Sequence, residues 1–440
     1  MSLFSTLATA ASGLGIAGTR LSVIGDNIAN INTIGFKSSR PQFADLVSQS
    51  AMGLSGTTQI GSGGATDTVS IQFGQGAITE SENALDLAIS GSGFYRVADS
   101  DQDLVYYTRD GQFFVDESGF IVNAGGKRLQ GYNGTAGALT TIVDDLQINT
   151  ETLAQQASTA LELQAILSSD SDFSTTPFDS GSFTFDGNTD TIDDAAQSAD
   201  FATSVTIYDS LGAAHDLTIL FERESATDWG WYAVVDGGEV GETEGAAFQI
   251  SSGDLSFDSD GIMTTFTQTD TSVATPWNFT GADDLTIDFQ LGVDSVGDDN
   301  DGSVRAVSGP SAVTAVSQDG YGTGDLLQLS VGQDGVLTGT YTNGEDLSLG
   351  QIVLADFPSY LGLKRAGYNL FQATAASGDP AMGAPGSGPR GTLVSFALEQ
   401  SNVDLEDEFV DMIQSQRTYQ ANARVISTTD ATLQELVQLL

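Results

Sequence analysis

Apolar residues recur every seven positions near the N-terminus, and a second apolar series lies between them. The two series contain Leu3, Leu7, Ala10, Leu14, Ala17, Leu21, Ile24 and Ile28. Apolar residues spaced alternately four and three apart are typical of a helix that packs along a seam against another helix. Glycines interrupt the segment at positions 13, 15, 18 and 25, and each weakens a helix by up to ~1 kcal/mol. We therefore predict a helix within residues 1–30 that is stable only when it is packed.

The C-terminus repeats this pattern in a sequence that favours a helix more strongly. One series contains Leu405, Met412, Tyr419, Ile426, Leu433 and Leu440, and the other contains Phe409, Gln416, Ala423, Asp430 and Val437. No glycine or proline occurs from Asp404 to Leu440. Asp404 is suited to be the N-cap, and the acidic residues after it suit the first turn. At about 1.5 Å per residue, this helix would be roughly 55 Å long.

A helix of this length with one apolar stripe has to pack against another element. An ordinary bundle within its own domain would suffice, but the only comparable helix that the sequence predicts is the one at the N-terminus. We therefore expect residues 1–30 and 400–440 to pair in a coiled-coil-like manner. Their remaining apolar side chains would contact neighbouring subunits, so both series are candidate subunit-packing residues.

Between the two ends, the pattern changes to short strands and turns. Residues 31–75 are polar and rich in Gly, Ser and Thr, which favours an extended connecting segment. Strand patterns within 76–145 and 319–399 predict one inner β domain built from both stretches, and 146–318 predicts an outer β insert of one or more domains. The predicted hairpin turns are Asp110-Gly111, Ser118-Gly119, Gln333-Asp334-Gly335 and Asn343-Gly344. The fold class is therefore multidomain, with paired terminal α-helices and mainly-β inner and outer domains nested between them.

The charge is strongly acidic. The 440 residues contain 59 Asp plus Glu against 14 Lys plus Arg, which gives a net charge of -45. Such a surface repels nucleic acid, anionic lipid and other copies of the chain, so self-assembly needs apolar contacts or screening by salt. Residues 146–318 carry 30 of the acidic residues and only two basic ones. We therefore expect the insert to be the most solvent-exposed part of any assembly.

The residues available for chemistry are few. The chain has no cysteine and one histidine, His215, which excludes disulfides, thiolate sites and multi-histidine metal sites. His215 lies in a predicted hairpin without a nucleophile or base motif, so we expect a structural role. The acidic run at 298–302 does not match a calcium loop, because Gly297 would occupy the first ligand position. We predict no catalytic, metal or cofactor site, and a protein that is not an enzyme.

The sequence also gives no sign of membrane insertion or of a secretory leader. No segment approaches 18 consecutive apolar residues, the length expected of a transmembrane helix. No Lys or Arg precedes Arg20, so the positive region of a signal peptide is lacking.

A further candidate site follows the predicted N-terminal helix. The side chains of Asn27, Asn30, Asn32 and Thr33 compete for backbone hydrogen bonds, and Gly35 can adopt backbone angles that other residues avoid. In the simpler interpretation, these residues end the helix. In the functional interpretation, they form a shaped joint between the helix and the outer domains and touch neighbouring subunits. The two interpretations are compatible, and we expect both.

Several segments resemble the family of flagellar rod and hook proteins. They are DNIANINTIGFK at 26–37, DLAISGSGF at 86–94, YTRDGQF at 107–113, LEQSNVDL at 398–405 and QRTYQANA at 416–423. The resemblance covers both ends and the inner strands, and Asp26 replaces an Asn that is usual in the family. Within the family, the length of the chain and its long insert are similar to hook proteins rather than to the shorter rod proteins.

The resemblance implies a structural subunit that polymerises into a curved, hollow tube. The tube would link rod to filament and transmit torque as a universal joint, with the terminal helices lining its inside. The implied partners are further copies of the chain, the distal rod protein, the hook cap protein, the hook–filament junction proteins and the flagellar type III export apparatus, without nucleic acid or membrane insertion. The implied location is the bacterial flagellum, outside the outer envelope, reached without a cleaved signal peptide. Alternatives are a distal rod or other axial component, or a secreted acidic β-protein with binding or enzymatic activity.

Overall fold

The computed structural model describes residues 3–46, 49–53, 56–99, 104–135, 138–148, 152–172, 185–270, 277–291 and 304–438. The chain divides into two compact units. The terminal unit comprises Met1–Thr150, Leu327–Thr340 and Asp346–Leu440, and the insert unit comprises Glu151–Leu326 and Tyr341–Glu345. Each unit has its own sheets and its own apolar clusters.

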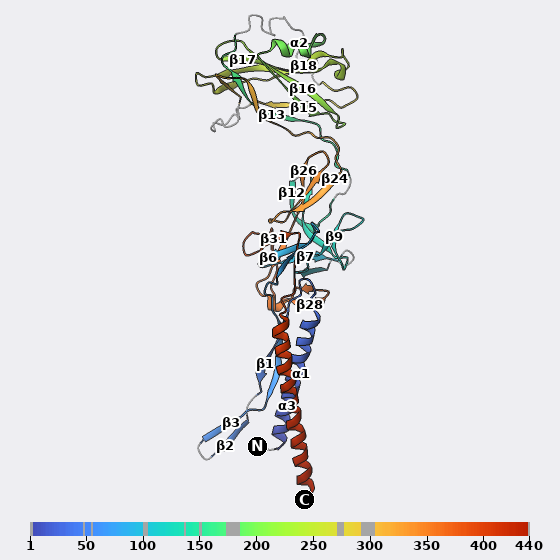
Figure 1. Ribbon diagram of the computed structural model, residues 1–440, viewed down its shortest axis with the longest axis vertical. Helices are drawn as coiled ribbons and strands as arrows, with labels where there is room; N and C mark the ends of the chain where they lie inside the picture. The colour runs from blue at the N-terminus through green and yellow to red at the C-terminus, as the bar shows by residue number, and fades with distance from the viewer. Residues whose placement is uncertain are drawn as a thin grey trace. The chain divides into compact units, whose positions relative to one another are not determined.

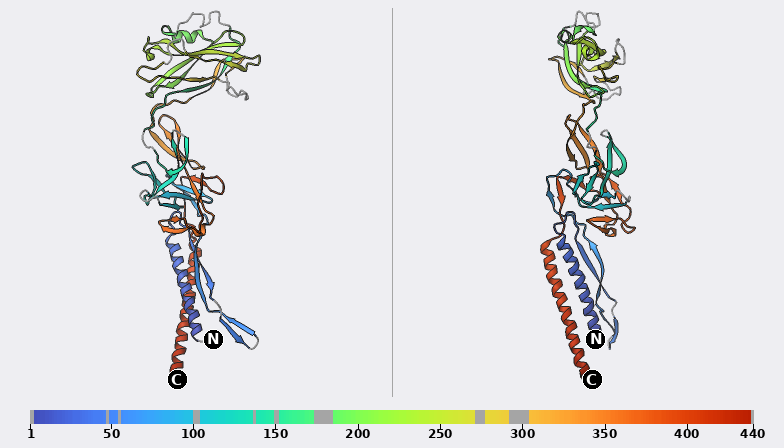
Figure 2. Two further views of the ribbon diagram at one scale, coloured as in Figure 1. Left: turned by 180° about the vertical axis from the view of Figure 1, so that it is seen from behind. Right: turned by 90° about the vertical axis from the view of Figure 1, so that its right-hand side faces the viewer.

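Long helices form at both ends of the chain, as the sequence predicts. α1 spans Leu3–Ala29 and α3 spans Leu405–Gln438. Within the terminal unit they lie side by side and run antiparallel (Figure 1 and Figure 2). The Asp404 carboxylate accepts a hydrogen bond from the backbone N–H of Glu406 at 2.9 Å, which satisfies one of the free N–H groups at the start of α3.

α1 is apolar on average, although polar residues interrupt it and keep every unbroken apolar run short. By length and composition alone, Ser5–Ala29 could cross a membrane, although the run-length criterion predicted no such segment. Core helices of soluble proteins and segments near an N-terminus pass the same test. Since α1 packs against α3, this stretch is weak evidence for a membrane span.

Residues 31–75 are more structured than the expected extended connecting segment. β1 (Ser39–Asp45) pairs antiparallel with β4 (Gly64–Ile71), and β2 (Gln49–Gly53) pairs with β3 (Gly56–Ile60) in the same way. α1 lies between the β1–β4 pair and α3 (Figure 2). Extended backbone carries unpaired N–H and C=O groups, and in this segment a neighbouring strand supplies their partners.

Most strands of the terminal unit belong to one 13-stranded sheet, and two further strand pairs join β5 with β32 and β6 with β31. Aromatic rings cover this region: those of Phe73, Phe357, Tyr360 and Phe371 lie with centroids within 6.0 Å of that of Phe94. The strands are β5 (Ile78–Glu80), β6 (Leu87–Ser90), β7 (Phe94–Ala98), β8 (Val105–Thr108), β9 (Phe113–Val115), β10 (Ile121–Asn123), β11 (Arg128–Thr135), β12 (Ala138–Asp145), β24 (Leu326–Val331), β25 (Val336–Tyr341), β26 (Asp346–Ile352), β27 (Leu354–Asp356), β28 (Lys364–Gly367), β29 (Leu370–Gln372), β30 (Ala381–Gly383), β31 (Thr392–Ser395) and β32 (Ala397–Glu399).

Three of the predicted turns join neighbouring strands, and one does not. Gly119, Gly335 and Gly344 have φ values of 81°, 80° and 89° and connect β9 to β10, β24 to β25 and β25 to β26. The prediction for Asp110-Gly111 was wrong, because β8 and β9 on either side of it do not pair. Gly111 instead lies against the backbone of Leu87, where a Cβ would come within 1.6 Å of the Leu87 carbonyl oxygen.

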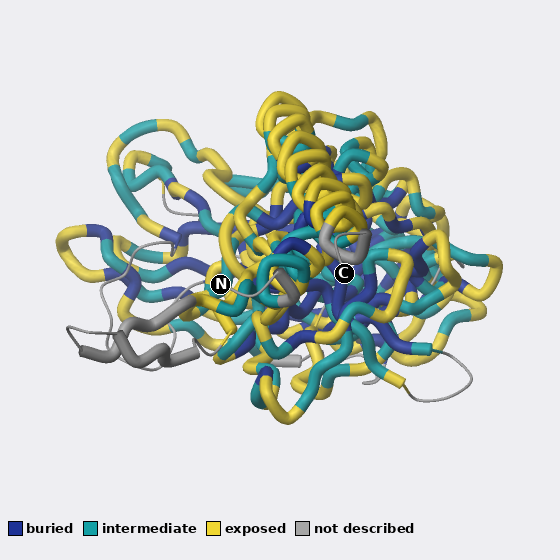
Figure 3. Tube along the Cα trace, turned by 90° about the horizontal axis from the view of Figure 1, so that it is seen from below, coloured by how far each residue is buried: buried dark blue, intermediate teal, exposed yellow. Residues whose placement is uncertain are grey.

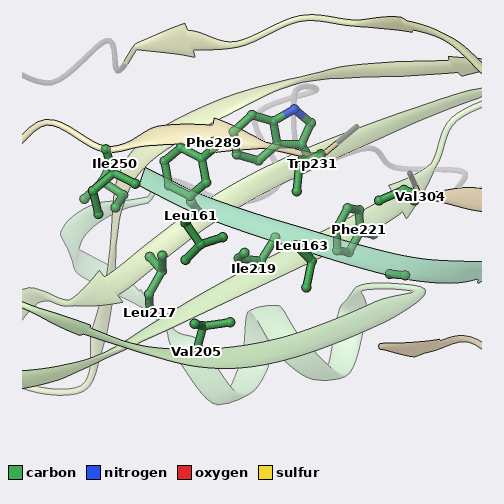
Figure 4. Close-up of a cluster of buried hydrophobic side chains, with 14 of the residues drawn as sticks. Leu161, Leu163, Val205, Leu217, Ile219, Phe221, Trp231, Ile250, Phe289 and Val304 are labelled. Carbon is green, nitrogen blue, oxygen red and sulfur yellow. The ribbon is translucent and has the colours of Figure 1, made fainter. Parts of the chain in front are cut away.

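The insert unit consists of a seven-stranded and a four-stranded sheet that share one apolar core. Every second residue of β13 is buried, from Leu161 to Leu167, as expected for a strand with one face on a core. Leu161 and Leu163 pack with Trp231 and Phe289 (Figure 4). The elements are β13 (Ala160–Ser168), β14 (Asp186–Thr191), α2 (Ile192–Ser198), β15 (Phe201–Tyr208), β16 (Ala214–Arg223), β17 (Asp228–Asp236), β18 (Ala246–Phe257), β19 (Met263–Phe266), β20 (Thr269–Asp270), β21 (Asp288–Gln290), β22 (Arg305–Val307) and β23 (Ala312–Gln318).

The insert unit begins a few residues later than the predicted boundary at 146. The backbone N–H of Leu146 donates to the Leu129 carbonyl at 2.8 Å, and that of Ile148 donates to the Gly119 carbonyl at 2.7 Å. Both residues are buried, so they continue the ladder of the terminal unit. Composition alone does not reveal such hydrogen bonds.

Candidate functional site

The contact between α1 and α3 is made largely by small and polar side chains. A Cβ on Gly13 would lie 2.7 Å from Nδ2 of Asn422, which shows how closely the helices approach. Two heptads further along α1, the Asn27 amide donates to Oε1 of Glu408 at 2.8 Å. Burial raises the pKa of the Glu408 carboxyl, and the hydrogen bond from Asn27 offsets only part of that effect. The seam therefore contains a partly buried polar pair rather than a continuous apolar line.

On α1 the buried seam follows one of the two predicted series, whereas on α3 it is displaced by one residue. On α1 the buried residues are Ala10, Ala17, Ile24 and Asn27. On α3 they are Ser415 and Thr429, each one residue before a predicted seam position. Small side chains let the two backbones approach, so they occupy the closest contact and the larger apolar side chains lie beside it.

The predicted packing residues are therefore spread over several degrees of burial. Ile24 is buried; Leu7, Leu14, Leu21, Ile28, Met412, Ile426 and Leu433 are half-buried; Leu405, Phe409 and Tyr419 are exposed. The side chains of Leu3 and Val437, and the whole of Leu440, lie outside the described residues.

Much of α3 is left without cover in the single chain, as Figure 3 shows for the helix that ends at the C-terminus. Its exposed large apolar side chains, which we call the α3 apolar surface, have exposed fractions of 38–54%. They are Leu405, Phe409, Val410, Ile413, Tyr419 and Val425. Three of them (Val410, Ile413 and Val425) were missed by the heptad analysis, because they belong to neither predicted series.

The predicted joint after α1 is held by side-chain hydrogen bonds and by close backbone packing. Asn30 ends the helix: its amide donates to the Asp26 carbonyl at 2.9 Å, and its Oδ1 accepts from the Thr33 hydroxyl at 3.2 Å. Gly35 has φ 68° and is buried. A Cβ there would lie 2.6 Å from the carbonyl carbon of Arg109, so both the backbone angle and the space require glycine. Asn32 is exposed.

Asn27 connects this joint to the first strand. Its side chain is buried, accepts from the Ser39 N–H at 2.9 Å and donates to the Ser39 carbonyl at 2.9 Å. Asn402 does the same from the other end of the chain, since it accepts from the Ser38 N–H at 2.7 Å and donates to the Gln72 carbonyl at 2.8 Å. Both chain ends are thus hydrogen-bonded to the start of β1.

A buried triad of charged residues lies beside the joint. Lys37 Nζ is 2.5 Å from Oε1 of Glu399, and Arg109 Nη1 is 3.3 Å from Oε2. The side chains of Lys37 and Glu399 are fully buried, and that of Arg109 is 4% exposed. The backbone N–H of Gly76 also donates to Glu399 at 2.9 Å. The sequence analysis missed this triad, although each member lies within one of the segments that resemble the rod and hook family.

The single histidine and the acidic residues were the candidates for chemistry in the sequence. The described part of the chain contains no cluster of His, Cys, Asp and Glu that could hold a metal ion, and the acidic run at 298–302 lies outside it. His215 stacks on Phe279 with ring centroids 3.5 Å apart, and its two ring nitrogens lie 2.9 Å from Glu239 and 3.3 Å from Asp209. These contacts tie the start of β16 to Phe279 and to the segments that follow β15 and β17.

Known proteins resemble this chain over its full length. It is 36% identical to the flagellar hook protein FlgE of Salmonella typhimurium over 98% of both chains, and 33% identical to that of Borreliella burgdorferi over 99% of this chain and all of the relative. The chain belongs to the flagellar hook protein FlgE family. It is therefore a structural subunit of the flagellar hook and not an enzyme.

Models of four flagellar protein families match successive parts of this hook subunit. They are the flagella basal body rod protein at 7–37, the flagellar hook protein FlgE/F/G D1 domain at 88–161, the flagellar basal body protein FlaE D2 domain at 174–321 and the flagellar basal body rod FlgEFG protein C-terminal region at 394–439. Lys37, Arg109 and Glu399 lie in three different matched segments. The buried triad therefore joins three family segments that are far apart in the sequence.

A solved structure supports the fold. The hook protein FlgE2 of Helicobacter pylori superposes with a TM-score of 0.52 at 15% identity, over 73% of this chain and all of that one. Full-length hook relatives do not favour the alternative of a rod component, and family membership sets aside a secreted acidic β-protein with enzymatic activity. The sequence resemblance to hook proteins is thus confirmed.

Proposed function

We propose that this hook subunit polymerises through its terminal helices into a curved, hollow tube that links the rod to the filament. The paired α1 and α3 line the tube in a coiled-coil-like manner, and the β domains nested between them form its outer shell. The observation that supports this most directly is the α3 apolar surface, which the described part of the chain leaves uncovered. In the tube, a neighbouring subunit covers it.

The helix seam and the α3 apolar surface contribute differently to this assembly. The seam includes the ion pair between Arg20 and Asp411, whose side chains are 37% and 48% exposed. Exposed ion pairs contribute only about 0–1 kcal/mol, so the seam sets the register of the pair more than it drives association. Apolar surface removed from water contributes about 25 cal/mol per Å², and this is the term that drives polymerisation.

The joint has a mechanical role in this proposal. A tube that transmits torque while bending needs rigid unions within each subunit, so that deformation occurs at the contacts between subunits. The signature residues Asn27, Asn30, Asn32, Thr33 and Gly35, with the buried triad beside them, supply that union between the helices and the β strands. Exposed members such as Asn32 are available to neighbouring subunits.

The remaining partners follow from the position of a hook. The chain contacts further copies of itself along the tube, the distal rod protein at its base, and the hook cap and hook–filament junction proteins at its tip. It leaves the cell unfolded through the flagellar type III export apparatus, without a cleaved signal peptide, and acts outside the outer envelope. Its charge of -45 opposes binding to nucleic acid and to anionic lipid surfaces, and α1 packs against α3 in place of a membrane.

The test removes part of the α3 apolar surface. We expect the double substitution Phe409→Ser and Ile413→Ser in the full chain to leave the β domains folded but to prevent tube formation, as seen by electron microscopy and sedimentation. Leu211→Ser is the matched control, since Leu211 is 61% exposed and lies in the insert unit. The proposal would be contradicted if the double variant formed tubes at the wild-type critical concentration. It would also be contradicted if Leu211→Ser prevented tube formation to the same extent.

A further inference from the structure

The hairpin formed by β28 and β29 has an unusual tip. Gly367, Tyr368 and Asn369 have φ values of 89°, 51° and 56°, so three consecutive residues adopt left-handed backbone angles. Glycine and asparagine tolerate this region, whereas a bulky residue such as tyrosine is strained there. Strain of this kind persists where the surrounding structure imposes it, and it is concentrated at functional positions.

The side chain at this tip has no cover in the chain itself. Tyr368 is 94% exposed, the highest value among the exposed large apolar and aromatic residues that the structure describes. The strained residue is therefore not held in place by a contact of its own ring. The exposed ring makes no stabilising contact of its own in the isolated subunit. A contact with another molecule would bury it.

The hairpin is held rigidly against the joint. The Asn369 amide donates to the Ile34 carbonyl at 2.7 Å, and the Asn369 carbonyl accepts from the Thr108 hydroxyl at 3.0 Å. Arg365 donates to the Lys37 carbonyl and lies 5.0 Å from the centre of the Phe36 ring. The base of the hairpin is thus fixed to the residues that end α1, and Tyr368 is presented from a pre-organised position.

We propose that Tyr368 is an anchor that packs onto the start of α3 in a second copy of the chain, a contact that rests on the polymerisation proposed above. The start of α3 offers Leu405 and Phe409, which are 41% and 43% exposed, next to the exposed acidic residues Glu406 and Asp407. This mixture suits an aromatic ring on a hairpin that also carries a cation.

Charge supports this choice of partner surface. Lys364 on β28 is exposed, and it is one of only 14 basic residues in a chain with 59 acidic ones. It lies at the base of the hairpin, opposite Gln372, and its positive charge complements the acidic first turn of α3. Most other surfaces of a second copy would repel each other, because both carry the same strong charge.

Position along the subunit supports it as well. The hairpin is bonded to the Lys37 carbonyl, and Lys37 forms an ion pair with Glu399, six residues before α3 begins at Leu405. The hairpin that begins with β28 and the start of α3 therefore lie at the same end of the helix pair (Figure 1). A second copy shifted mainly perpendicular to the helix pair would therefore place the start of its α3 next to the Tyr368 tip of the first copy.

The first test is Tyr368→Asn in the full chain, because asparagine removes the ring and tolerates left-handed angles. We expect unchanged or higher thermal stability of the monomer, but a critical concentration for tube growth about tenfold higher, a typical effect of losing an interface tyrosine. Tyr368→Phe should behave like the wild type. Leu211→Asn, which removes an equally apolar exposed side chain from the insert unit, should leave tube growth unchanged.

A second test identifies the partner surface. The chain has no cysteine, so Ala366→Cys beside the tip and Glu406→Cys at the start of α3, both at exposed positions, can be made singly, mixed and copolymerised without removing Tyr368 or Phe409. A short bifunctional thiol cross-linker should yield covalent dimers from mixed tubes and not from monomers or from tubes of either variant alone. Tubes of Tyr368→Asn at the wild-type concentration, or mixed tubes without cross-linked dimers, would overturn the anchor and leave the polymerisation proposal standing. A wild-type chain that forms no tubes would overturn both.

Discussion

Lys37, Arg109 and Glu399 place two cations and one anion in a site almost closed to water. Burying charge costs free energy unless each charge is paired and hydrogen-bonded. Burial lowers the pKa of the Lys37 ammonium, and the Glu399 carboxylate beside it offsets only part of this effect. Both cations therefore depend on one carboxylate, and Glu399 is the residue whose loss would be felt most.

At this scale we expect Glu399→Ala to destabilise the terminal unit by about 3–5 kcal/mol, the usual cost of leaving a buried charge unpaired. Chemical denaturation of the monomer, followed by fluorescence and circular dichroism, measures the change. Glu80→Ala is the matched control: Glu80 is exposed on β5 and pairs with Ala397 on the neighbouring strand β32, so its replacement should stay within about 0.5 kcal/mol. A similar effect of both substitutions would contradict the role assigned to the triad.

Some of these residues were predictable and others were not. Asn30 and Gly35 could be identified because ending a helix and adopting left-handed angles are local properties of their side chains. Lys37, Arg109 and Glu399 gave no such signal, since 362 residues separate the two that form the shortest ion pair. The resemblance to rod and hook proteins covered all three, but a motif does not say which of its residues meet.

At the scale of elements, the heptad pattern predicted both helices. Its phase agrees with the buried residues Ala10, Ala17 and Ile24 on α1, but it is one residue away from the buried residues of α3. The apolar series predicted both helices and their approximate ends. It did not predict the line of closest contact, because large side chains were assumed to face the partner within the same chain. Gly13 and Asn422 take that position, and Phe409 is left exposed. A polymer subunit reserves part of its apolar surface for its neighbours, which a single sequence does not distinguish.

The glycines of α1 test this contact line. Gly13→Leu should force the helices apart at Asn422 and lower the stability of the helix pair by about 1–3 kcal/mol, as overpacking does. Gly15→Leu is the control, since a Cβ there meets no atom within 4 Å, and it should raise helix stability by up to ~1 kcal/mol. Thermal unfolding followed by far-ultraviolet circular dichroism measures both, and an equal shift for the two variants would argue against the observed register.

At the scale of the whole molecule, assembly has to overcome a net charge of -45. The insert, residues 146–318, holds 30 acidic residues and only two basic ones. The other basic side chains therefore lie outside it. Repulsion between copies acts over the Debye length, about 10 Å at 0.1 M salt and about 3 Å at 1 M. Apolar burial on α3 depends on area and changes far less with salt. The two terms can therefore be separated by ionic strength.

We expect polymerisation of the full chain to be slow at low ionic strength and to speed up as NaCl is added, because screening weakens the repulsion and leaves the apolar contact intact. A light-scattering time course measures the rate, and a series in CaCl2 matched for ionic strength serves as the control. Equal rates in the two salts would mean that general screening is sufficient. Rates that fall with added NaCl would refute the repulsion argument, and a saturable response to micromolar calcium would point to a specific cation site in the insert.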